Sequence, residues 1–210
     1  MNKIYDWREL KLQSMDLILC SGNYRMSKAI QYFQRLTGAP PQAAYISHVA
    51  ALASTPQQPD YGNSQLLQVQ ESTTLNKWAD QEGVQVNWLP EWLANYNGVV
   101  FVRKLDFVRN AAFQAGDYDF WNEHKNDPYE SGVPGTVELL LAGLRLHRFV
   151  PWYQPLQTKA LHCTELVSER VGFHGLWDKV IFPNRMPPWL WYDMIDDWLT
   201  CPIGKIIRIK

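Results

Sequence analysis

The stretch TKALHCTELVSERVGF, residues 158–173, is the most informative part of this sequence. From Cys163 onward, leucine and valine recur at helical spacing until Gly172 ends the pattern. The sequence therefore predicts a helix over about 163–171 whose apolar face packs against a sheet. A cysteine at the first turn of such a helix is either a small core residue or a nucleophile, because the helix N-terminus favours the thiolate.

The composition predicts one globular domain. The chain has 210 residues, of which 46% are hydrophobic and 20% charged, enough for one substantial core. We expect a single domain over 1–210 with a Trp-rich C-terminal extension at about 173–210. The formal net charge is −1, which gives no electrostatic argument for nucleic acid or an anionic membrane surface. The oligomeric state is left open.

The three cysteines do not form a recognisable framework. Cys20, Cys163 and Cys201 are widely spaced, odd in number and without a CxxC pair, which argues against disulfides and a finger-type zinc site. A zinc site built from His48, His162 and Cys163 lacks a fourth ligand. We therefore expect no metal and no cofactor.

The sequence contains no segment that resembles a signal peptide or a membrane-spanning helix. Residues 1–16 lack the apolar core of a signal peptide. The longest apolar stretch, 137–146, is too short to span a bilayer and contains charges. The expectation is a cytoplasmic protein without stable membrane insertion, with export independent of a signal peptide left open.

Hydrophobic periodicity predicts several short strands and several helices. They do not alternate strictly, which favours an α+β fold. Strands are predicted at 16–22, 44–54, 65–72, 83–88, 98–105 and 203–210, with the second and third as a hairpin. Helices are predicted at 26–37, near Pro90, at 107–115 after an Asp106 N-cap, at 136–149 and over Trp191–Leu199, with a long loop at 117–135.

Two further residues are candidates to activate the cysteine. His48 interrupts an apolar strand, where a polar side chain needs a partner. Glu71 closes the neighbouring strand, and a carboxylate there would orient the imidazole. The alternatives are a hydrogen-bonded core histidine and a solvated acid, and another acid such as Glu82 is an alternative to Glu71.

These residues, taken in order, resemble a known family. MDLILCSG, SHVAAL, QVQES, GVQVNWL, FVRKL and LHCTELVSERVG together resemble the circularly permuted NlpC/P60 papain-like cysteine hydrolases, the YiiX/YebB-like group. The order histidine, carboxylate, cysteine marks the permutation. Met15 stands where the family pattern commonly has glycine.

The resemblance implies an antiparallel sheet packed against the nucleophile-bearing helix. It makes Cys163 the nucleophile, His48 the general base and Glu71 the orienting acid. The implied activity is thiol-dependent hydrolysis of an amide, in a peptide or peptidoglycan fragment, through an acyl-enzyme. Two alternatives stay open: a lipid acyl hydrolase or acyltransferase with the same site, and a catalytically silent binding or structural module.

Three aromatic residues are further candidates for the substrate site. Tyr24 follows the turn after the first predicted strand, where its hydroxyl would supply a hydrogen bond near the reacting group. Trp152 and Tyr153 precede the cysteine helix and would line a cleft.

Overall fold

The computed structural model describes residues 3–54, 67–73, 83–128, 163–178, 186–194 and 198–210. No helix among these residues is long and apolar enough to cross a membrane. The elements in chain order are a 3₁₀ turn (Trp7–Glu9), β1 (Leu17–Gly22), α1 (Arg25–Leu36), β2 (His48–Ala53), β3 (Gln68–Thr73), β4 (Gly83–Trp88), α2 (Leu89–Asn95), β5 (Gly98–Leu105), α3 (Ala111–His124), α5 (Cys163–Phe173), α6 (Pro188–Asp193) and β6 (Ile203–Arg208).

Six strands form one sheet in the order β4-β3-β2-β1-β5-β6, and every neighbouring pair is antiparallel. This architecture is α+β, as predicted, and β2 and β3 pair as the expected hairpin partners. In the register of β1 and β2, Cys20 lies directly opposite His48. The C-terminal segment is part of this fold, because β6 extends the sheet beside β5.

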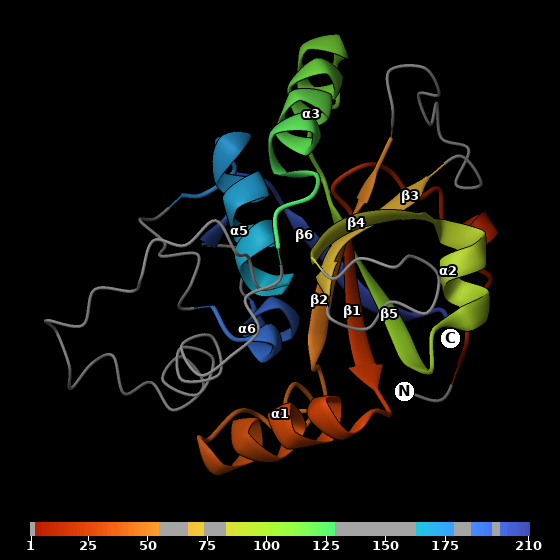
Figure 1. Ribbon diagram of the computed structural model, residues 1–210, viewed down its shortest axis with the longest axis vertical. Coiled ribbons are helices and arrows are strands. Elements are labelled where there is room, and N and C mark those ends of the chain that lie inside the picture. Colours follow the sequence, from red (N-terminus) through yellow and green to blue (C-terminus); the bar gives the residue numbers. More distant parts are fainter. Residues whose placement is uncertain (1–2, 55–66, 74–82, 129–162, 179–185, 195–197) are drawn as a thin grey trace, which may run out of the picture.

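The two faces of the sheet are covered by different helices. Leu19 and Val49 belong to the core beneath α5 and α6, where Val167 and Trp191 also lie. Ile18 and Ala50, one step along the same strands, belong to the second core beneath α2. Because successive strand residues point to opposite faces, the continuous apolar runs of β1 and β2 supply both cores. Figure 1 shows α5 and α6 on one side of the sheet and α2 on the other.

A buried aspartate fixes the start of β1. Asp16 accepts hydrogen bonds from the main-chain N–H groups of Gln13 and Leu105 and from the guanidinium of Arg109. Burial raises the pKa of Asp16 to about 6, although Arg109 opposes the shift. Met15, just before it, has a φ of 68°. This left-handed conformation is the one that glycine adopts most readily.

A buried ion pair joins α5 to α3. Both nitrogens that Arg170 directs at Asp117 lie 2.6 Å from its carboxylate oxygens. Ser14 and His174 also contact that carboxylate, at 2.9 and 3.2 Å. Arg170 and Asp117 are 1% and 3% exposed, so the pair locks the cysteine helix in place from its far end.

Three sequence predictions are wrong in their bounds. Helix α3 begins at Ala111 because the Asn110 side chain accepts a hydrogen bond from the N–H of Phe113, and it continues to His124 through most of a predicted loop. Asp117 does not lie in a solvated loop, as the polar sequence suggested. It is buried in α3, where its carboxylate pairs with Arg170.

The other two differences have equally local causes. The strand expected from residue 44 begins at His48, because Ala43 and Ala44 hydrogen-bond back to Pro40 in a turn. Helix α6 ends at Asp193, because the guanidinium of Arg103 donates hydrogen bonds to the main-chain carbonyls at this end of the helix. These are the carbonyls of Trp191, Tyr192 and Met194. The helix predicted at 136–149 lies outside the described residues.

Candidate active site

His48 and Glu71 form the centre of the candidate site. His48 is the first residue of β2, and Glu71 lies on the adjacent strand β3. The Nε2 atom of His48 lies 2.7 Å from the Oε2 atom of Glu71. Their side chains are only 15% and 6% exposed, so the contact is a strong, largely desolvated hydrogen bond.

Cys163 completes a chain of three groups. It is the first residue of α5, and its side chain hydrogen-bonds to His48. Because Glu71 occupies Nε2, the Nδ1 atom is the ring nitrogen left to face the thiol. The structure thus brings together the three residues that the sequence analysis singled out from three separate segments.

The electrostatics of His48 favour its charged form. Burial lowers the pKa of His48, but the charge and hydrogen bond of Cys163 and the hydrogen bond and charge of Glu71 outweigh burial and raise it to about 10. The protonated imidazole is therefore favoured at neutral pH, with Cys163 and Glu71 as its two neighbours. A thiolate beside an imidazolium is the nucleophile of cysteine hydrolases.

Trp92 holds the other oxygen of the carboxylate, and the sequence analysis did not identify it. Its indole Nε1 donates to Oε1 of Glu71 at 2.8 Å. Trp92 is buried on α2 and stacks on Tyr96, with ring centroids 4.7 Å apart. A tryptophan in a short apolar helix is easily interpreted as core alone, and only the packing of α2 against the sheet brings its N–H to Glu71.

Hydrogen bonds around β1 position the start of β2. The hydroxyl of Ser47 accepts a hydrogen bond from the N–H of Gly22 at 3.1 Å, which ties the residue before His48 to the end of β1. Cys20 is fully buried opposite His48 and hydrogen-bonds with Tyr96. Burial raises the pKa of the Cys20 thiol well above its usual value, so this second cysteine stays neutral.

The remaining candidates are not brought to this site by any described contact. Tyr24 is the N-cap residue of α1, and no described hydrogen bond joins it to Cys163, His48 or Glu71. Trp152 and Tyr153 lie outside the described residues, as do Glu82 and His162.

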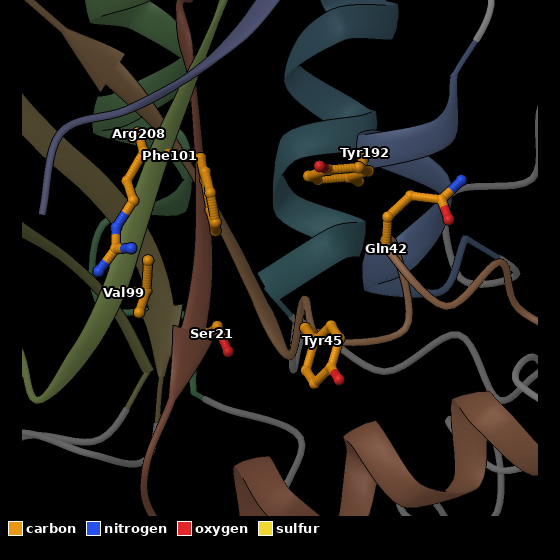
Figure 2. Close-up of a pocket in the computed structure, with 7 residues that line it drawn as sticks. All are labelled: Ser21, Gln42, Tyr45, Val99, Phe101, Tyr192 and Arg208. Atoms are coloured by element: carbon orange, nitrogen blue, oxygen red, sulfur yellow. The ribbon is translucent and has the colours of Figure 1, made fainter. Parts of the chain in front are cut away.

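A cavity of about 500 Å³ opens on the α5 side of the sheet. Figure 2 shows side chains from β5, α6 and the turn before β2 around it. Cys163, His48 and Glu71 are not among the residues that line the cavity. The chain connects the two regions, since Ser21 follows Cys20 on β1 and Tyr45 lies in the turn before His48. Its size is typical of a small-ligand site. Its walls include Ser21, Tyr45, Val99, Phe101, Tyr192 and Arg208.

Aromatic rings and one cation give this cavity its chemistry. The Phe101 and Tyr192 rings meet edge to face, with centroids 6.0 Å apart. The Nε atom of Arg208 donates to the main-chain oxygen of Lys210, and no described carboxylate pairs with the rest of its guanidinium. The cavity therefore suits an apolar group that carries a negative charge.

Within the described part of the chain, no group of three or more histidine, cysteine or acidic side chains is arranged to hold a metal ion. No model of a known protein family matches the chain, and no curated protein matches it.

Proposed function

We propose that this protein is a thiol-dependent hydrolase of an amide bond, with a permuted papain-like arrangement of Cys163, His48 and Glu71. The observation that carries the proposal is the continuous chain of contacts from the thiol through the imidazole to a buried carboxylate. The three residues come from α5, β2 and β3, and their contacts run in the order thiol, imidazole and carboxylate that nucleophilic catalysis uses.

The reaction follows from these contacts. The Cys163 thiolate attacks the carbonyl carbon and forms a C–S bond, and the main-chain N–H at the start of α5 stabilises the oxyanion. His48 gives its proton to the leaving nitrogen as the C–N bond breaks. Water then attacks the thioester while His48 takes its proton, and the acid product leaves as the thiolate is restored.

The cavity lined by Phe101, Tyr192 and Arg208 supports a peptide-like substrate over a simple lipid. Its aromatic walls accept an apolar or aromatic side chain, and Arg208 offers a partner for a carboxylate. An acyl chain would use the apolar walls but leave the guanidinium without an anion. The proposed substrate is therefore a peptide or peptidoglycan fragment with an apolar or aromatic residue close to a carboxylate.

The first test measures the reactivity of each cysteine. The intact protein is treated with iodoacetamide at several pH values, and mass spectrometry of its peptides gives the labelling rate of each thiol. Cys201 is an internal control of the same exposure as Cys163, 5%, and burial raises the pKa of its thiol. We expect Cys163 to react at least about tenfold faster than Cys201 at pH 7, because an unperturbed thiol is mostly protonated there.

A His48→Ala variant tests the pairing. The fast labelling of Cys163 should be lost at pH 7 in this variant, and its labelling rate should recover as the pH rises toward about 10, where an ordinary thiol ionises. Equal labelling of Cys163 and Cys201, unchanged by His48→Ala, would remove the hydrolase proposal and favour a catalytically silent binding module. Hydrolysis of short peptides, compared with phospholipids and with Cys163→Ala as the blank, then separates the two substrate classes.

A further inference from the structure

Helix α1 is inverted: its polar side faces the protein and its apolar side faces solvent. Ser27, Gln31 and Gln34 are buried. Gln31 donates to the carbonyl of Gly22, and Gln34 donates to two carbonyls in the turn before β2. The helix is therefore held to the sheet by hydrogen bonds to main-chain atoms and hardly by apolar packing.

The outward side of α1 carries large hydrophobic residues at helical spacing. Met26, Tyr32, Phe33 and Leu36 are between 39% and 62% exposed. They are four of the ten exposed large hydrophobic residues in the described part of the chain. Contiguous exposure of this kind marks an interaction surface, because isolated exposed hydrophobic residues are normal but clusters are not.

The charge of the same helix has one sign. Arg25, Lys28 and Arg35 are exposed, and α1 contains no acidic residue. The guanidinium of Arg35 lies over the ring of Tyr45, 4.5 Å from its centroid. Tyr45 is itself 48% exposed and lines the cavity. Through the contact of Arg35 with Tyr45, the basic surface of α1 reaches the wall of the cavity.

We propose that the outward face of α1 binds an anionic lipid surface, with α1 lying parallel to it. An apolar stripe flanked by arginine and lysine is the pattern of helices that lie in the membrane interface, where the apolar side chains enter the headgroup region and the cations meet lipid phosphates. In Figure 1, α1 lies across one end of the sheet.

Charge complementarity selects this occupant over a second copy of the chain. A symmetric pairing of two α1 faces would bring three cations of each copy toward three of the other without an acid on either helix. Like charges at a desolvated contact are costly. An anionic bilayer neutralises the same cations and buries the same apolar side chains.

The test is flotation of the full chain with lipid vesicles. Vesicles of phosphatidylcholine alone are compared with vesicles that also contain phosphatidylglycerol, each at low and high salt. We expect binding to the anionic vesicles, weakened by salt. A Phe33→Ser/Leu36→Ser variant should weaken partitioning at least about tenfold, and Arg25→Gln/Lys28→Gln about fivefold or more per cation.

Two matched variants control for general changes of the surface. Val108→Ser removes a hydrophobic side chain that is 81% exposed away from α1, and Lys205→Gln removes an exposed cation on β6. Both should bind vesicles like the unaltered protein. Thermal unfolding of every variant verifies that the fold is retained.

Three outcomes overturn the proposal: no binding to anionic vesicles, equal binding to both vesicle types, or binding that the α1 variants leave unchanged. A concentration-dependent dimer in sedimentation velocity, abolished by Phe33→Ser/Leu36→Ser in the absence of vesicle binding, would assign the face to a second copy instead. Vesicle binding does not require a reactive thiol, so this test and that of the hydrolase proposal succeed or fail independently.

Discussion

Helices α1 and α5 have 12 and 11 residues, but they use their two sides in opposite ways. Helix α5 buries Leu166 and Val171 against the sheet, whereas α1 exposes Leu36 and buries Gln34. The hydrophobic spacing of each predicts an amphipathic helix. The apolar side of α5 faces the sheet, whereas the apolar side of α1 faces solvent. Hydrophobic periodicity alone therefore does not determine which side of a helix faces the protein.

The largest effect should come from breaking the buried ion pair of α5. Arg170→Met leaves the Asp117 carboxylate without its main partner, so the free energy of unfolding should fall by about 3–5 kcal/mol. Denaturant unfolding measures the change. The control is Arg35→Met on α1, whose exposed cation should contribute less than about 0.5 kcal/mol. Similar losses for both variants would contradict the distinction between the helices.

The same leucine truncation on each helix gives a direct comparison. Leu166→Ala on α5 removes a side chain that is 1% exposed and should destabilise the protein by about 2–5 kcal/mol. Leu36→Ala on α1 removes a side chain that is 62% exposed, and stability should change by no more than about 0.5 kcal/mol. A large loss from Leu36→Ala would show that this leucine is packed within the fold.

The buried amide of α1 should matter more than its leucine. Gln34 donates to the carbonyls of Ala44 and Ile46 and accepts from the N–H of Trp189. Gln34→Leu increases the apolar character of the helix but leaves these buried groups unpaired, so stability should fall by about 1–3 kcal/mol. Thermal unfolding is the measurement, and a stabilised variant would refute the inverted packing of α1.

The smallest expected effect is on the pH dependence of hydrolysis at the site where α5 begins. Hydrolysis requires protonated His48 as the acid, so activity should be full at neutral pH and fall as the pH rises through about 10, the pKa of His48. Glu71 contributes to raising that pKa, so Glu71→Gln should move the fall to lower pH. The profile of the rate against pH and the NMR titration of the His48 ring both measure it.

Two controls accompany this titration. Glu91→Gln changes an exposed acid on α2 and should leave the profile where it is. Trp92→Phe removes one hydrogen bond to Glu71 without changing its charge, so the fall should move less than in Glu71→Gln. A profile that ignores Glu71→Gln would separate the carboxylate from the chemistry.

Much of the secondary structure was predictable, because local periodicity and turn residues specify it. Strand β5 and helix α1 lie within a residue of the predicted bounds. The errors fall where a tertiary contact overrides the local pattern. Arg103 ends α6 early, and the pairing of Asp117 with Arg170 keeps a polar segment helical. Neither contact partner is near in sequence.

The net charge of the chain did not predict the local charge of its surface. A formal charge of −1 for the whole chain gave no reason to expect an anionic partner. The three cations and absent acids of α1 become meaningful only because the helix turns that side outward. A local surface charge depends on which residues the fold exposes, and a sum over the chain does not contain this information.

By itself, the sequence determined that the chain forms an α+β protein, that a cysteine begins a helix, and that a histidine and a glutamate lie on neighbouring strands. Tertiary structure alone decided that His48 meets both Cys163 and Glu71, that Trp92 holds the second carboxylate oxygen, and that α1 presents its apolar side to solvent. The physical reason is range: propensity and periodicity act within a few residues, whereas these contacts depend on strand register and on which surfaces pack together.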